Sequence, residues 1–257
     1  QLSPSKAAPI NFGAKIQFTP DEDTSDLLDD DGIKCVQGIV RALLYYARAV
    51  DNKLLYTLSD IGSEQAAATT RTNQKVHQLL DYCATYPNDG ITYRASNMIL
   101  GAHANVAYLN VTKSRSRAGA HIMCTENDPI PSPNGPILTV AQIIKFVMSS
   151  AAEAKLAGLY ICAKEMVPLC QSLIEMGWPQ PKSPIQMDNS TTVEFINNTI
   201  ITHRIKMICM RIHWLRYCES QGQFRFYWEK CAKNLANYNT KHHLPAYHLA
   251  HRSTHAG

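Results

Sequence analysis

The stretch ILTVAQIIKFVMSSAAEAKLAGLYICAKEMVPLCQSLIEMGWPQPKSPIQMDNSTT, residues 137–192, decides the fold. Residues 137–147 are apolar and β-branched with few polar interruptions, which is typical of a strand buried on both faces. A serine pair at 149–150 then precedes an Ala-rich segment, a usual start for a helix. After a Pro-rich crossover, residues 185–187 predict a second strand that ends at Asp188. Because sites in open α/β sheets lie at the carboxyl ends of strands, Asp188 is the first candidate for chemistry.

Outside this stretch the pattern changes once, from helices to alternating strands and helices. Helical spacing of apolar residues predicts a small bundle over residues 33–94. The expected strands lie at 98–108, 118–124, 137–147, 185–188 and 223–228, with a long helix before the fourth and helices near 192–198 and 205–215 before the fifth. This order predicts an α/β fold with a mixed five-stranded sheet flanked by helices and preceded by a small helical segment. We divide the chain into an acidic linker or extended arm (1–32), connecting helices (33–95), an α/β domain (96–245) and a polar, His-rich tail (246–257).

Charge is distributed unevenly along the 257 residues. Residues 21–31 hold seven Asp or Glu and no base, whereas residues 32–257 hold 23 Lys and Arg against 14 Asp and Glu. A basic body fits an anionic partner such as nucleic acid, and a solubilising charge excess explains it equally well. The eight cysteines lack metal-ligand spacing, and no signal peptide or membrane-length apolar run occurs. We therefore expect an intracellular protein, cytoplasmic or nuclear, with no membrane partner.

Several segments resemble the C-terminal part of copia-type retrotransposon polyproteins, in the right order over about residues 33–245. They are GIVRALLYYARAVDNKLLYTLSDIGSEQAA, HQLLDYCATYPNDGITYRAS, IIKFVMSSAAEAKL, IQMDNSTTVEFINN, RIKMICMRIHWLRYCESQGQFRFYW and NLANYNTKHH. The first two resemble the end of the reverse transcriptase region, and the others a ribonuclease H (RNase H) domain. The resemblance implies an RNase H fold. It also implies hydrolysis of the RNA strand of RNA–DNA hybrids by two divalent metals, held by four carboxylates.

The resemblance places those four carboxylate positions at Asn105, Lys155, Asp188 and Asn237, so that only Asp188 keeps its acid. Lys155 puts an ammonium where a cation would bind, and the two amides carry no charge. Glu153 lies two residues before Lys155, which turns a helix by roughly 200°, so it should face away. We expect no bound metal and no cofactor, with Mg²⁺ or Mn²⁺ required only by an active site, and we expect Lys155 to pair with Asp188.

Three functions stay open. The first is a catalytically impaired or inactive RNase H-like domain, acting as a scaffold or nucleic-acid-binding module. Its partners would be an RNA–DNA hybrid or other nucleic acid, the rest of a Pol polyprotein, or another protein. The second is an active RNase H with rearranged ligands, for which Glu194 and Glu229 are the nearby acids. The third is a protein-interaction module without a nucleic-acid role.

Basic and histidine side chains supply the remaining candidates. Five basic side chains near the first hairpin and on a later helical region are candidates for phosphate contacts, and a solvated basic surface explains them equally well. They are Lys113, Arg115, Arg117, Lys206 and Arg211. His103 and His121 lie on expected strands and are interpreted as core or edge residues. The histidines from 242 onward lack a Cys/His framework for zinc, so we expect a solvated tail.

Overall fold

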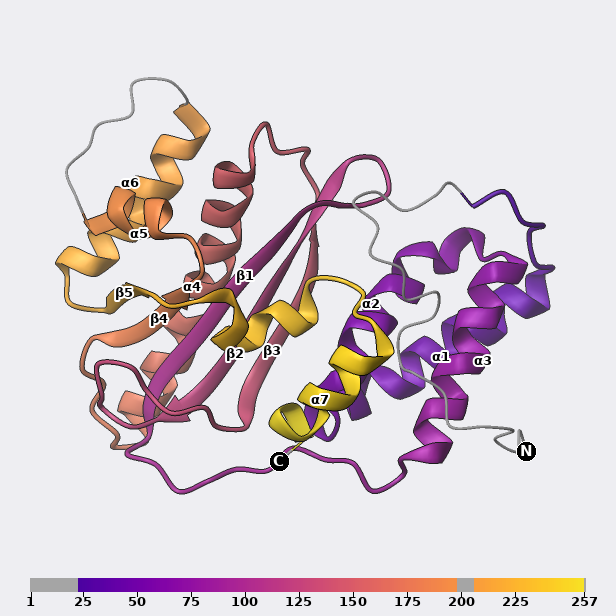
Figure 1. The fold of residues 1–257 in the computed structure, drawn as a ribbon, viewed down its shortest axis with the longest axis horizontal. Coiled ribbons are helices and arrows are strands. Elements are labelled where there is room, and N and C mark those ends of the chain that lie inside the picture. The colour runs from indigo at the N-terminus through magenta and orange to yellow at the C-terminus, as the bar shows by residue number, and fades with distance from the viewer. Residues whose placement is uncertain (1–22, 198–205, 257) are drawn as a thin grey trace. The chain divides into compact units, whose positions relative to one another are not determined.

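The computed structural model describes residues 23–197 and 206–256, which form two compact units (Figure 1). Unit 2 runs from Tyr93 to Thr240, and unit 1 combines the chain before it with the chain from Lys241 onward. None of the helices in these described ranges is long and apolar enough to span a membrane.

Unit 1 is helical, and its elements are α1 (Asp30–Ala49), η1 (Asn52–Leu54), α2 (Leu55–Glu64), η2 (Gln65–Ala67), α3 (Thr70–Thr85) and α7 (Pro245–Ala256). The Asp29 carboxylate accepts a hydrogen bond from the Gly32 N–H and so begins α1. Thr69 and Thr72 form a capping box at the start of α3. Buried apolar side chains of η1, α2 and α3 meet in its interior: Leu54, Leu58, Ile61, Val76 and Leu79.

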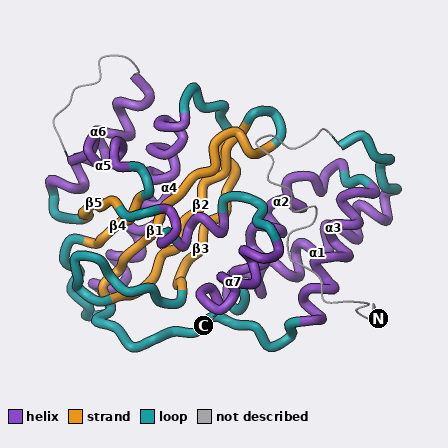
Figure 2. The backbone as a smooth tube through the Cα atoms, in the orientation of Figure 1, coloured by secondary structure: helices purple, strands orange, loops and turns teal. Residues whose placement is uncertain are grey.

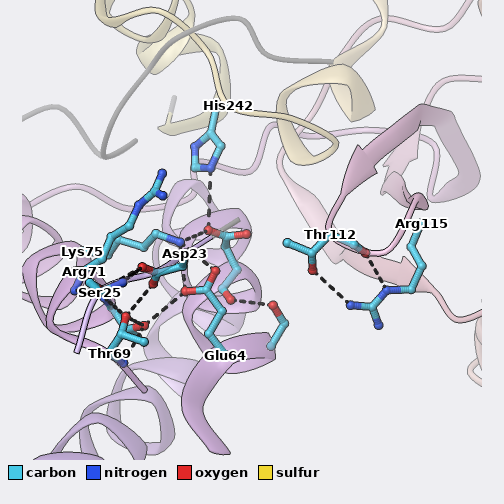
Figure 3. A network of polar contacts seen from close by, with 12 residues as sticks. Asp23, Ser25, Glu64, Thr69, Arg71, Lys75, Thr112, Arg115 and His242 are labelled. Carbon is cyan, nitrogen blue, oxygen red and sulfur yellow. Dashed lines mark hydrogen bonds and ion pairs between the residues drawn. The ribbon is translucent and has the colours of Figure 1, made fainter. Parts of the chain in front are cut away.

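The acidic segment before α1 is attached to unit 1 where the structure describes it. The Thr69 hydroxyl donates to Asp23 at 2.6 Å (Figure 3). The Leu28 N–H donates to the Ala68 carbonyl at 2.9 Å. The expected arm, residues 1–32, therefore includes an ordered portion from Asp23. Residues 1–22 lie outside the described residues.

The His-rich C-terminal segment also belongs to unit 1, and the expectation that it is solvated is wrong at two positions. His243 and His248 are 6% and 1% exposed. The His242 ring lies edge-on to Tyr56, with 4.8 Å between ring centroids, and its Nε2 is 3.7 Å from Asp60 (Figure 3). A polar composition concealed this burial because tertiary contacts, rather than local hydropathy, cover these rings.

Unit 2 holds a five-stranded sheet in the order β3-β2-β1-β4-β5 (Figures 1 and 2). The first three strands are antiparallel, whereas β4 runs parallel to β1 and β5 parallel to β4. The strands are β1 (Ile99–Val111), β2 (Arg115–Thr125), β3 (Pro136–Ile144), β4 (Ser183–Met187) and β5 (Phe224–Trp228). The sheet confirms the predicted α/β class and its five strands.

Helices α4 (Ala151–Glu175) and α6 (Lys206–Ser220) contribute to the main core of unit 2, with α5 (Ser190–Asn197) beside them. The short helices η3 (Cys231–Lys233) and η4 (Leu235–Asn239) follow β5, and η4 contacts β1 and β2. Ser150 caps α4 as predicted, because its hydroxyl accepts from the Glu153 N–H at 3.1 Å. The core includes Leu100, Ala102, Ile122, Leu159, Met166, Ile185, Met187 and Phe226.

The expectation that residues 137–147 form a strand buried on both faces is wrong. β3 is an edge strand that ends at Ile144, and Ile137 is 40% exposed. Phe146 and Val147 lie beyond the strand and are exposed. An apolar run reports strand propensity, but it does not distinguish a central strand from an edge strand.

Candidate functional site

The four positions singled out by sequence converge at one end of the sheet. β1 carries Asn105, the first turns of α4 carry Lys155, Asp188 directly follows β4, and η4 carries Asn237. The Lys155 ammonium donates to the Asn105 Oδ1 at 2.5 Å and to both Asp188 carboxylate oxygens at 2.7 and 2.8 Å. The Asn105 amide in turn donates to the Asn237 Oδ1 at 3.1 Å. The predicted ion pair between Lys155 and Asp188 is present.

A glycine brings α4 close enough for Lys155 to reach β1. A Cβ atom on Gly158 would lie 2.1 Å from the Val106 Cγ2 and 3.4 Å from the Asn105 carbonyl oxygen. Only a residue without a side chain permits this approach. Lys155 lies three residues earlier on the same helix, so its side chain extends from the turn beside Asn105.

Asparagine and glycine side chains fix η4 from the other side. The Asn234 amide donates to the Ala104 carbonyl at 3.0 Å, and the Leu235 N–H donates to the His103 Nδ1 at 3.1 Å. A Cβ on Gly119 would lie 2.7 Å from the Ala236 carbonyl oxygen. These contacts hold Asn237 against Asn105. Sequence reasoning missed Asn234, Gly119 and Gly158. A sequence signal for the two glycines did exist: Gly119 is a lone Gly within a predicted strand, and Gly158 is a lone Gly within a predicted helix. Such positions indicate a close approach of another element.

The site is electrically balanced and largely shielded from water. The Lys155 side chain is 18% exposed and the Asp188 side chain 10%. An ammonium has three N–H donors, and three oxygen atoms accept from this one. The Trp228 indole N–H donates to the Asp188 carbonyl at 3.3 Å, which links the end of β5 to the site. The cation that compensates the carboxylate is therefore part of the chain itself.

The alternative acids lie elsewhere. Glu153 accepts from the Ser149 N–H and hydroxyl at 2.8 and 2.7 Å, so it caps α4 and turns from Lys155 as predicted. Glu194 is exposed, and Glu229 accepts from the Lys230 N–H and pairs with Lys233 at 3.5 Å. No group of three His, Cys, Asp or Glu side chains within the described ranges could hold a metal.

The donors present do not fit two divalent cations. Such a pair needs several anionic oxygens that converge from different elements. Here one carboxylate converges with two neutral amides and an ammonium. The ammonium stands where positive charge would be added, so it repels a metal as well as removing a ligand.

The predicted phosphate-binding side chains are dispersed. Lys113 is exposed in the β1–β2 turn, and the partly exposed Arg115 donates to the Thr112 carbonyl at 3.1 Å (Figure 3). Arg117 is 0% exposed within β2, so it does not lie on the basic surface on which the prediction of its phosphate contact depends. The Arg211 guanidinium, on α6, lies 5.8 Å from the centroid of the Tyr160 ring on α4. The Lys206 side chain lies outside the described residues.

Two buried histidines occupy neighbouring strands beneath the site, as expected for core residues. His103 and His121 are Cα partners across β1 and β2. Burial lowers the pKa of His103 from 6.5 to about 3, and it lowers the pKa of His121 to about 4. The Nδ1 of His103 accepts the Leu235 N–H, and the Nε2 of His121 lies 2.9 Å from the Asn134 carbonyl. Both rings are neutral structural groups at neutral pH.

The strand order and directions described above are those of an RNase H-like α/β fold. No protein-family model matches the chain, and no curated protein does. LC11-RNase H1, isolated from compost by a metagenomic approach, is 10% identical with a TM-score of 0.43, over 56% of this chain and 93% of that one. RNase H1 from the halophilic archaeon Halobacterium salinarum NRC-1 is 12% identical with a TM-score of 0.35, over 55% and 93%.

A viral enzyme is also similar to the chain. The foamy viral protease-reverse transcriptase, solved in complex with dsDNA, is 14% identical with a TM-score of 0.44. That similarity covers 82% of this chain and 40% of the viral one.

Proposed function

We propose that the chain is a catalytically inactive RNase H-like domain of a copia-type retroelement polyprotein, preceded by the last helices of its reverse transcriptase. It acts as a scaffold that binds nucleic acid. The observation that carries the loss of catalysis is the Lys155 ammonium, which hydrogen-bonds to Asp188 and Asn105. At an effective dielectric constant near 20, a unit charge pair 4 Å apart interacts with about 4 kcal/mol. Exchanging carboxylates for amides and an ammonium therefore removes the attraction that metal binding requires.

Support for the retroelement origin comes from the sequence segments that resemble copia-type polyproteins and from the order in which helices precede the sheet. The chain also keeps a basic body of 23 Lys and Arg against 14 Asp and Glu over residues 32–257. Such a charge excess attracts a phosphate backbone irrespective of sequence. An RNase H-like sheet that no longer cleaves would then hold a hybrid or duplex without consuming it.

The test of inactivity is incubation with a labelled RNA–DNA hybrid in Mg²⁺ or Mn²⁺. The wild-type chain should leave the hybrid intact, and calorimetric titration should detect no Mn²⁺ bound near Asp188. The informative comparison is Asn105→Asp/Lys155→Glu/Asn237→Asp, which converts all three lost positions to carboxylates and should bind Mn²⁺. Metal-dependent cleavage by the wild type that disappears in Asp188→Asn would show that the site is active.

The test of binding is a fluorescence titration of hybrid, duplex and single strands at several salt concentrations. Affinity should fall steeply with salt, because each phosphate contact releases a counterion. Lys113→Gln/Arg115→Gln should reduce the salt slope, and Lys164→Gln, which changes an exposed lysine on α4, serves as the control. A flat titration with every nucleic acid would instead favour a protein-interaction module.

A further inference from the structure

One row of side chains is polar across the whole sheet. Strand register aligns five Cα positions, one on each strand: Thr139, His121, His103, Gln186 and Tyr227. In-register residues of neighbouring strands point to the same face. Ile185 and Met187, the chain neighbours of Gln186, belong to the apolar core shared with α4. The polar row therefore faces away from α4, one rung below Asn105.

Gln186 has no protein partner in this row. It is 1% exposed, and neither its Nε2 nor its Oε1 has a hydrogen-bonding partner among the residues that the structure describes. Its neighbour His103 uses Nδ1 to accept the Leu235 N–H, so the proton of that ring is on Nε2. A primary amide buried with both ends unbonded costs about 1–3 kcal/mol for each group left unsatisfied.

The chain that delivers the site residue Asn237 crosses over this position. The Glu229 N–H donates to the Met187 carbonyl at the end of β4, and the Leu235 N–H reaches His103 on β1. Residues 230–234 therefore pass from β5, at the edge of the sheet, over β4 to β1 on the face where Gln186 lies. Figure 1 shows this crossing as the segment that leaves β5 and runs over the sheet toward β2. Gln186, at 1% exposed, is closed off from bulk water.

We propose that Gln186 binds an ordered internal water molecule beneath residues 230–234. Water has the size and the combined donor and acceptor character that a buried amide needs, and globular proteins hold about one such molecule per 27 residues. The water accepts from the Gln186 Nε2 or donates to its Oε1, and its remaining bonds go to His103 or to the crossing backbone. It fastens the crossing segment to β4, so Gln186 contributes to the placement of Asn237. This inference stands whether or not the site is catalytically inactive.

The direct test is water–protein cross-relaxation by NMR on the full, isotope-labelled wild-type chain. A long-lived internal water gives cross-peaks at the water frequency to the Gln186 side-chain amide protons, with the sign of a rigidly bound molecule. Tyr227→Phe is the control, because it removes the nearest exchangeable hydroxyl in the row, and the cross-peaks should persist in it. Their absence from the wild-type chain, or their loss in Tyr227→Phe, would overturn the proposal.

A second test compares two glutamine substitutions by thermal unfolding. Gln186→Met keeps the length of the side chain and removes the amide to which the water binds, so the unfolding midpoint should fall by about 2–4 °C. Gln142→Met changes an exposed glutamine on β3 in the same way and should leave the midpoint unchanged. A midpoint that is unchanged or higher in Gln186→Met would show that the amide is unsatisfied in the folded chain, which would contradict the proposal.

Discussion

At the scale of single residues, the most consequential side chain is Lys155. Its ammonium is bonded to Asp188 and Asn105 and is mostly buried. A buried ion pair contributes little net stability relative to an apolar pair of similar volume, but loss of one partner leaves the other charge uncompensated. Lys155 therefore links α4 to Asn105 on β1 and to Asp188 after β4, and its charge repels cations from the same site.

Replacing Lys155 with Met should reduce the free energy of unfolding by about 3 kcal/mol, because the Asp188 carboxylate is left buried without its cation. The measurement is urea denaturation at pH 7. The double variant Lys155→Met/Asp188→Asn should recover much of the loss, since Asn carries no charge to compensate. Equal losses in the single and double variants would mean that the two side chains are not energetically coupled.

The buried histidines predict a pH dependence of stability. In the unfolded chain both rings gain a proton below about pH 6.5, whereas in the folded chain His103 and His121 stay neutral until about pH 3 and 4. The unfolded state thus binds more protons, and the free energy of unfolding falls as the pH drops from 6.5, by up to about 1.4 kcal/mol per pH unit for each ring.

His103→Asn isolates one of these rings. The Asn Oδ1 can replace the Nδ1 as acceptor for the Leu235 N–H, and the amide does not titrate. Urea denaturation between pH 6 and pH 4.5 should show a shallower loss of stability than in the wild type. An unchanged slope would mean that this ring does not titrate differently in the folded and unfolded chains.

At the scale of secondary-structure elements, the approach of α4 to β1 depends on Gly158. Gly158→Ala would place a methyl group 2.1 Å from the Val106 Cγ2, so the helix must move. We expect a loss of about 2–3 kcal/mol of stability, measured by chemical denaturation.

Two further variants separate the clash from the general effect of adding a methyl group. Gly38→Ala, on α1, adds its methyl where no atom lies within 4 Å, and it should stabilise the chain by up to about 1 kcal/mol. Gly158→Ala/Val106→Ala should regain part of the loss. A Gly158→Ala variant as stable as the wild type would show that the two elements are not in close contact.

Much of this architecture could be predicted from local pattern. The Ser150 cap, the strand that ends at Asp188 and the order of elements follow from short-range chemistry. The ion pair between Lys155 and Asp188 follows only from the family resemblance, which assigns both positions to one site. The edge position of β3 and the burial of Arg117 could not be predicted, because both depend on which elements become neighbours. The contribution of Asn234 was hidden for the same reason, since its partner Ala104 lies 130 positions earlier.

At the scale of the whole molecule, the path of the chain is discontinuous in unit 1. The helices before Thr92 and the segment after Lys241 share one unit, and unit 2 is inserted between them. His243 and His248 are buried there although the local sequence is polar. Stability of the helical unit therefore depends on a segment that follows the sheet in the chain.

Fragments test this dependence. A fragment of residues 93–240 should unfold cooperatively, because it contains its own sheet and core. A fragment of residues 23–92 should lack cooperative unfolding until a peptide of residues 241–257 is added, since that peptide supplies His248 and its contact with Tyr82. Circular dichroism and thermal unfolding measure both outcomes. Cooperative unfolding of 23–92 alone would contradict the expectation.

This insertion also determines how the molecule would respond to mechanical tension. A force applied at Asp23 and Ala256 would be transmitted across the contacts between the two segments of unit 1, and the intervening sheet would bear no load until those segments separate. Under traction, the helical unit would rupture first, and the corner that holds Lys155 would remain intact until it had done so.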